Sequence, residues 1–164
     1  NNNYNSVKPY ECKHCQKECL GLVCEYFAKN IISPDIIKKE HVEIEQYLDD
    51  YANNKISKPD KCKCCKNRNC LNWHCKYYRK NVITLGGKYS KFPIRCVCCK
   101  ICNAVFNLLP EFLIKYYRFT KYVIEYTLNK IKKITYEKTF EILHCIFDIN
   151  VTINTLQNWT NLRL

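Results

Sequence analysis

Hydrophobic and polar positions follow two different periods along this chain of 164 residues. Residues 73–78 and 92–97 are two runs of aromatic, β-branched and alternating polar residues, and the tight Gly86-Gly87 pair lies between them. Such a pattern is typical of a β-hairpin. Beyond residue 118 the apolar residues recur every three or four positions, which predicts helices. The pattern therefore predicts an α+β protein in which a hairpin precedes a helical bundle.

Helices are expected over residues 31–51, 118–133, 135–147 and 153–163, and residues 52–60 are expected to be a linker. Ser33-Pro34 is a suitable helix start, and Pro110 is expected to open a helix or a turn. Asn150 is expected to adopt the left-handed backbone of a sharp turn, and Thr152 to cap the last helix. The residues predicted to face inward are Ile36, Ile37, His41, Ile44, Tyr47, Phe119, Tyr122, Val123, Tyr126, Ile131, Tyr136, Phe140, Leu143, Ile146, Phe147, Ile153, Leu156 and Trp159.

The last two predicted helices and their short connection are typical of a helix-turn-helix. Leu156 and Trp159 would hold the second helix against its neighbours. Its other face would then be free to enter a DNA major groove, where Asn and Gln can pair with adenine. That face would present Asn154, Thr155, Gln157, Asn158 and Asn161. The alternative is a small helical bundle with an Asn-rich surface.

The chain contains 14 cysteines in close clusters, and residues 1–10 contain no apolar run that would indicate a secretory signal. Metal binding is therefore favoured over a disulfide framework, and we expect a cytoplasmic protein. Cys62-x2-Cys65 and Cys99-x2-Cys102 are two knuckles on either side of the predicted hairpin, which is the arrangement of a zinc ribbon. Four thiolates close the coordination of a zinc ion, so the expected role of this first zinc is structural.

Other cysteines leave alternatives open. Cys64 and Cys98 are adjacent to predicted ligands, but using either would break the paired two-residue spacing. Cys96 and Cys98 share one face of a strand and could be core thiols. The remaining three are predicted to be buried small apolar residues: Cys70, Cys75 and Cys145.

A second zinc site is predicted near the N-terminus, where four cysteines lie within 13 residues of one another. Its ligands would be Cys12, Cys15, Cys19 and Cys24. In alternative sets His41 replaces Cys19 or Cys24. The other interpretation is a cluster of free or partly buried thiols.

The formal net charge of +12 is unevenly distributed. Residues 1–60 contain 8 Lys and 10 Asp or Glu, whereas residues 61–102 contain 11 Lys or Arg and no carboxylate. This imbalance favours a polyanionic partner for the basic part, with double-stranded DNA first. The predicted phosphate contacts are Lys76, Arg79, Lys80, Lys88, Lys91 and Arg95, with Lys132 and Lys133.

Two other kinds of partner remain as alternatives. RNA could stack on Trp73, Tyr77 and Tyr78, although such aromatics are more often core residues. A protein partner or a second copy could use the acidic N-terminal part. No run of about 18 apolar residues occurs, so no membrane span is expected. The five acidic residues after residue 60 have no spacing suited to a two-metal catalytic site, so we expect a binding module and not an enzyme.

These motifs together resemble a bacterial transposase-like family in which a zinc ribbon precedes a helix-turn-helix. The family carries a Cys-x2-Cys knuckle, an aromatic and basic strand, a Cys-x2-Cys-Gly knuckle followed by an aromatic residue and Leu-Leu-Pro, then an aromatic-basic segment and a helix-turn-helix ending in Trp. The matching positions are Cys62 and Cys65, residues 74–79, Cys99 and Cys102, Phe106 with Leu108-Leu109-Pro110, residues 112–119, and Trp159. Asn103 and Asn150 stand where the family usually has glycine.

The resemblance covers about residues 60–164 and implies DNA binding in a mobile-element context. Residues 1–60 lie outside the resemblance. Charge and motifs together predict three parts: a Cys-rich acidic segment with the second zinc site and the linker over residues 1–60, a zinc ribbon over 61–110 and a helix-turn-helix over 111–164.

Overall fold

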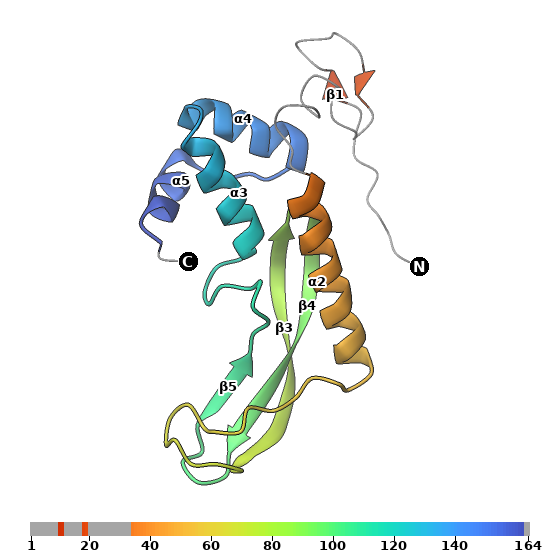
Figure 1. Ribbon diagram of the computed structural model, residues 1–164, viewed down its shortest axis with the longest axis vertical. Helices are drawn as coiled ribbons and strands as arrows, with labels where there is room; N and C mark the ends of the chain where they lie inside the picture. The colour runs from red at the N-terminus through yellow and green to blue at the C-terminus, as the bar shows by residue number, and fades with distance from the viewer. Residues whose placement is uncertain (1–9, 12–17, 20–33, 163–164) are drawn as a thin grey trace. The chain divides into compact units, whose positions relative to one another are not determined.

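A computed structural model describes residues 10–11, 18–19 and 34–162, and it confirms the α+β class (Figure 1). The described elements are β1 (Tyr10–Glu11), β2 (Glu18–Cys19), α2 (Pro34–Ala52), β3 (Leu71–Thr84), β4 (Gly87–Cys99), β5 (Val105–Leu108), α3 (Lys121–Ile131), α4 (Tyr136–Phe147) and α5 (Ile153–Thr160). The chain divides into two compact units, one formed by residues 36–126 and the other containing residues 127–162. None of the described helices is both long and apolar enough to cross a membrane.

The predicted hairpin is present as the antiparallel pair β3–β4. Its turn is one residue earlier than expected, because Thr84 pairs with Gly87 and the turn residues are Leu85 and Gly86. Gly87 has a φ of +142°, a backbone angle that only glycine adopts without strain. The Thr84 hydroxyl donates to the Gly87 carbonyl at 2.9 Å and closes the turn.

β5 adds a third antiparallel strand against residues 95–98 of β4. The sequence pattern does not predict this strand, because four residues are too few for a clear two-residue period. β5 follows the second cysteine knuckle directly. Asn103 lies between them, and its left-handed backbone, with φ of 57°, makes the turn that glycine usually provides. The sheet order is β3-β4-β5, so β3 is an edge strand.

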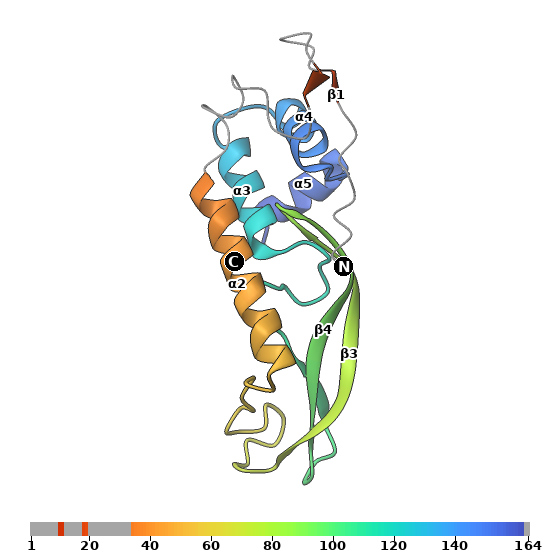
Figure 2. The same ribbon diagram turned by 90° about the vertical axis from the view of Figure 1, so that its right-hand side faces the viewer.

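α2 lies along the edge of β4 that β5 leaves unpaired, and Figure 2 shows β4 between β3 and α2. The Tyr47 hydroxyl donates to the Pro93 carbonyl at 3.1 Å, and the Tyr47 ring stacks on Phe92 at 5.6 Å between centroids. Pro93 is tolerated at this edge because no strand needs its missing N–H. The helix begins at Pro34, as predicted, but His41 is exposed, and its neighbour Glu40 is buried instead.

α4 and α5 form the helical pair of the second unit. Thr152 caps α5 as predicted, accepting the backbone N–H of Thr155 at 3.2 Å. The left-handed residue of the connection is Asp148, with φ of 51°, and not Asn150. α4 therefore ends at Phe147, and the N–H of the capping residue Asp148 reaches back to the Leu143 carbonyl.

The apolar face of α5 is narrower than predicted. Leu156 and Trp159 are buried, but Ile153 is 43% exposed because it lies in the first turn, ahead of the packed face. The other inward predictions hold in part: Leu143 is buried, whereas Phe140 and Phe147 are half-buried.

Candidate functional site

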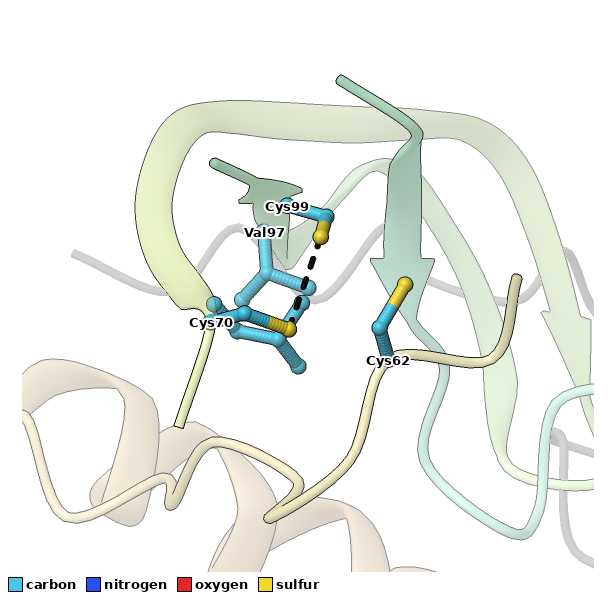
Figure 3. Close-up of a cluster of buried hydrophobic side chains, with 5 residues drawn as sticks. Cys62, Cys70, Val97 and Cys99 are labelled. Carbon is cyan, nitrogen blue, oxygen red and sulfur yellow. Dashed lines mark hydrogen bonds between the residues drawn. The ribbon is translucent and has the colours of Figure 1, made fainter. Parts of the chain in front are cut away.

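Four cysteine sulfurs converge where the start of β3 meets the end of β4. The Sγ atoms of Cys62, Cys65, Cys70 and Cys99 all lie within 4.8 Å of one another, so this group could hold a metal ion, with zinc the natural occupant of a four-sulfur site. Figure 3 shows Cys62, Cys70 and Cys99 beside Val97. Cys62 is 1% exposed and Cys99 is fully buried, so the centre is closed to solvent on that side.

The two knuckles have the same backbone conformation. In the first, the N–H of Lys66 bonds to the Cys62 carbonyl at 3.1 Å, and Lys66 has a φ of 62°. In the second, the N–H of Asn103 bonds to the Cys99 carbonyl at 2.9 Å, and its φ is 57°. A residue with left-handed backbone thus follows the second cysteine of each pair and folds the loop back on itself. Two equivalent loops from distant parts of the chain therefore present their sulfurs to one point.

Backbone N–H groups point at the sulfurs of both knuckles. The N–H of Cys64 donates to Cys62 Sγ at 3.4 Å, and the N–H of Ile101 donates to Cys99 Sγ at 3.4 Å. The backbone N–H of Cys102, with that of Ile101, lowers the pKa of Cys99 to about 6 against the opposing effect of burial. The N–H of Asn67 likewise lowers the pKa of Cys65. Both effects favour the thiolate form that binds a metal.

Cys102 is adjacent to the same cluster. Its Sγ lies 3.7 Å from Cys62 Sγ, and Cys65 Sγ lies 3.6 Å from Cys99 Sγ. A tetrahedral zinc with bonds of about 2.3 Å separates its sulfurs by about 3.8 Å, so both pairs have suitable edges. Two ligand sets are therefore open. Both contain Cys62, Cys65 and Cys99, and the fourth member is Cys102 in the predicted set and Cys70 in the other. The identity of the fourth ligand stays a prediction.

Cys70 is the residue that the sequence analysis missed at this site. It is buried as expected, but its Sγ lies 3.4 Å from Cys99 Sγ and its thiol donates to the Asn67 carbonyl at 3.1 Å. Burial raises the pKa of Cys70 to about 11. The pKa of Cys102 is raised as well, to about 12: the Ala104 backbone N–H lowers it, but burial and the neighbouring thiols together outweigh that effect. The pKa therefore does not choose between these two thiols as the fourth ligand. The strand register was the available signal, because Leu71, the next residue, pairs with Cys99.

The remaining cysteines are scattered around the sheet. Cys75 is exposed, contrary to the prediction, because both faces of β3 are uncovered there. Cys96 is a buried core thiol that donates to the Asn107 side chain at 3.0 Å, as its strand position allowed. Cys64 is exposed and Cys98 half-buried. The side chain of Cys145 lies outside the described residues.

The predicted N-terminal zinc site also falls outside the described residues. This applies to Cys12, Cys15 and Cys24 and to the side chain of Cys19, which belongs to β2. The alternative ligand His41 is described and lies exposed on α2.

The predicted phosphate-binding residues fall into two groups. Lys76, Lys80, Lys88 and Lys91 are exposed on the hairpin, and the ion pairs among the described residues, Lys55–Asp49 and Arg68–Asp60, do not involve them. The two arginines are engaged within the protein. Arg79 donates to the carbonyls of Ile114 and Tyr117, and Arg95 donates to the Asn54 side chain while stacking on Tyr51 and Trp73.

Four of the five predicted DNA-reading residues are exposed on α5 or directly after it. Asn154, Gln157 and Asn158 are exposed on α5, and Asn161 is exposed where the helix ends. Thr155 is half-buried, and its hydroxyl lies 3.0 Å from that of Thr152. Lys132 and Lys133, which follow α3, are exposed in the same unit.

Residues 62–159 match the family model of a domain of unknown function, DUF6431. The matched segment begins at the first cysteine of the metal centre and ends at the buried Trp159 of α5. No curated protein and no solved structure matches the chain. The transposase-like context that the sequence resemblance implied therefore stays a prediction.

Proposed function

The chain belongs to the DUF6431 family, and we propose that it is a DNA-binding protein in which a structural zinc ion stabilises a ribbon and α5 recognises the major groove of a duplex. The matched segment contains both parts of this proposal, because it includes both cysteine knuckles and the α4–α5 pair. The proposal assigns the chain a binding role and not a catalytic one.

The exposed amide face of α5 is the observation that carries this function. Leu156 and Trp159 are buried, whereas Asn154, Gln157 and Asn158 project from the opposite side of the helix. Amide side chains can form paired hydrogen bonds with the adenine edge in the major groove. Thr152 fixes the start of α5 by capping it, and the N-terminal part of a recognition helix is the part that contacts base edges.

Zinc has a structural role in this proposal. We assign Cys62, Cys65, Cys99 and Cys102 as its ligands, because the two equivalent knuckles then contribute two sulfurs each. Four thiolates leave no open coordination position, so the ion would add folding free energy and not chemistry. Behind the centre lies a small apolar cluster that includes Leu71 and Val97, too few residues to hold the ribbon without a metal.

The hairpin lysines supply affinity without sequence preference. Lys76, Lys80, Lys88 and Lys91 form no ion pair with the described carboxylates, so each is available to neutralise a phosphate. The two hairpin arginines are left out of this surface, because their guanidinium groups are held by contacts within the protein.

The test is binding of the zinc-loaded full chain to mixed-sequence duplex DNA across a salt series, followed by selection of a preferred site. We expect affinity for the duplex to fall steeply as salt rises. On the selected site, each of Asn154→Ala, Gln157→Ala and Asn158→Ala should weaken binding between about fivefold and 150-fold if its amide reads a base. Asn129→Ala, an exposed amide on α3 of the same unit, is the matched control. Absence of duplex binding at low salt would overturn the proposal.

A further inference from the structure

The central part of β3 is uncovered on both faces. All seven residues from Asn72 to Tyr78 are exposed, although they belong to one continuous strand paired with β4. β3 is also an edge strand, and its described edge contacts lie near its two ends, where Lys58 Nζ donates to the Leu71 carbonyl and Ile83 bonds to Arg118 and Thr120. Figure 2 shows β3 on the side of β4 away from α2. Contacts within this unit cover the large side chains only in part. Arg95 and Lys58 lie over Trp73, and Tyr78 interacts with Tyr51 of α2. The rings of Trp73 and Tyr78 nevertheless stay exposed over more than two fifths of their surface.

The strand register separates these side chains into two faces. Trp73 pairs with Val97, Lys76 with Arg95, and a bulge between them accounts for the extra residue in β3. Val97 and Arg95 are two positions apart on β4, so Trp73 and Lys76 share a face. Tyr78 and Lys80 continue that face at two-residue intervals. We call Trp73, Lys76, Tyr78 and Lys80 the ring–lysine row.

The row alternates aromatic rings with cations. Trp73 is 43% exposed and Tyr78 is 49% exposed. Trp73 is held in place by the Arg95 guanidinium, 5.4 Å from the ring centroid, and by Lys58 Nζ at 5.9 Å. The exposed part of this ring is thus fixed in orientation before any partner arrives.

The charge on the row is not balanced by the rest of the hairpin. Lys80 pairs directly across the strands with Lys91, an arrangement of like charges that destabilises a sheet. Neither lysine forms an ion pair with a described carboxylate. A polyanion lying along β3 would remove this repulsion, so the charge pattern selects a negatively charged occupant.

We infer that the ring–lysine row binds single-stranded nucleic acid, with bases stacked on Trp73 and Tyr78 and phosphates beside Lys76 and Lys80. Alternating rings and cations match the alternation of bases and phosphates along a single strand. A duplex cannot use the rings, because its bases are stacked on one another. The row shares no residue with the amide face of α5, and the inference does not depend on the proposed duplex recognition.

The chain provides a site-specific signal for this binding. It contains two tryptophans, of which Trp159 is 1% exposed and Trp73 is half-exposed. Stacking of a base on Trp73 should therefore quench the part of the fluorescence that Trp73→Ala removes. The experiment titrates the zinc-loaded full chain with oligo(dT) and oligo(U) of about 12 nucleotides, which is within the range of strand-binding sites, and follows quenching and anisotropy.

Tyr77 and Tyr78 provide the matched comparison. They are neighbours on one strand, are exposed to 43% and 49%, and point to opposite faces. Tyr78→Ala should weaken oligonucleotide binding by about tenfold or more, because one stacked ring is lost. Tyr77→Ala should leave it within about twofold of the unchanged protein. The double variant Lys76→Ala, Lys80→Ala should lower the slope of log affinity against log salt by about 1.4.

Several outcomes would overturn the inference: no quenching of Trp73 by either oligonucleotide, equal effects of the two tyrosine variants, or duplex displacing the single strand from Trp73. Unchanged binding in Asn154→Ala and Gln157→Ala separates this surface from α5, so each proposal can fail alone. Comparison of oligo(U) with oligo(dT) distinguishes an RNA strand from a DNA strand. Zinc content and circular dichroism of every variant verify that the hairpin is intact.

Discussion

The backbone N–H of Leu85, in the hairpin turn, donates a hydrogen bond of 2.7 Å to a side-chain oxygen of Glu40 on α2. The second oxygen of Glu40 accepts the hydroxyl of Thr120, just before α3. Glu40 is 1% exposed, so this carboxyl is enclosed by the three segments that it joins. One buried acid therefore fixes α2, the tip of the hairpin and the start of α3 relative to one another.

Glu40→Gln is expected to change how stability depends on pH. Burial raises the pKa of Glu40 from 4.5 to about 7, with the Thr120 and Leu85 hydrogen bonds opposing it. The folded state therefore binds the proton more tightly than the unfolded state does, and the resulting stabilisation is complete below pH 4.5 and is lost as pH rises through 7. Above that range, the charged Glu40 carboxylate lowers the free energy of unfolding by up to about 3 kcal/mol. The neutral amide of Glu40→Gln avoids this loss.

The measurement is urea unfolding of Glu40→Gln and the unchanged protein between pH 5.5 and about 8, a window set by the raised pKa. The difference in free energy of unfolding should shift in favour of the variant as pH rises. Glu45→Gln, an exposed residue of the same helix, is the control. A pH-independent difference would show that the Glu40 carboxyl does not titrate in this window.

Cys102→Ser and Cys70→Ser decide which thiol completes the metal centre. We expect Cys102→Ser to lose zinc to a competing chelator at least about tenfold more readily, because it removes a ligand of the second knuckle. Cys70→Ser should retain one zinc, since it removes only a buried thiol beside Cys99. Cys64→Ser, an exposed neighbour of the first knuckle, is the control. The reverse result would assign Cys70 as the fourth ligand.

Chelation of the metal should unfold the ribbon before the helical pair. The apolar cluster behind the knuckles is small. Leu156 and Trp159 are buried in the other unit, which does not contain the knuckles. Hydrogen exchange before and after chelation should therefore show lost protection over β3 and β4 and retained protection in α4 and α5. Simultaneous loss in both would indicate that the metal stabilises the whole chain.

Asp148→Gly is expected to raise the stability of the helical pair by about 0.5–1 kcal/mol. Asp148 has left-handed backbone geometry, which costs a residue with a side chain but not glycine. It also places a negative charge at the end of α4, where the helix dipole disfavours it. Asn150→Gly should give no such gain, because Asn150 is not among the residues with positive φ. Thermal unfolding of both variants makes the comparison.

Arg79→Ala should destabilise the first unit by about 2–3 kcal/mol, because the guanidinium donates to the carbonyls of Ile114 and Tyr117. Chemical unfolding measures this cost. Lys80→Ala, the exposed neighbour on the opposite face, should change stability little but weaken nucleic-acid binding. If Arg79→Ala instead weakened nucleic-acid binding and left stability unchanged, the assignment of Arg79 to a stabilising role within the first unit would be wrong.

The sequence predicted local features well and long-range contacts poorly. Residue types at fixed short spacings predicted three features that the structure has: the start of α2 at Pro34, the cap of α5 at Thr152 and the two knuckles. Cys70 and Glu40 acquire their surroundings from residues 29 and 45 positions away, which no local pattern contains.

The prediction placed the left-handed residue between α4 and α5 at Asn150 and not at Asp148, and this error has a local cause. Asp148 and Asn150 are both tolerant of left-handed geometry, so residue type alone did not choose between them. The choice depended on where α4 ends, because the left-handed residue is the one that lets the backbone bond back to Leu143.

The position of Pro93 also bears on self-association of the sheet. Pro93 and α2 together close one side of β4, so a strand from another molecule could extend the sheet along β3 or along the short β5, and β3 is much the longer edge. That strand carries Lys76 and Lys80, and a second copy would bring the same charges against them. These lysines therefore act as gatekeepers against edge-to-edge aggregation. Neutralising them by mutation, acetylation or high salt would leave a long aromatic edge open to fibrillar growth.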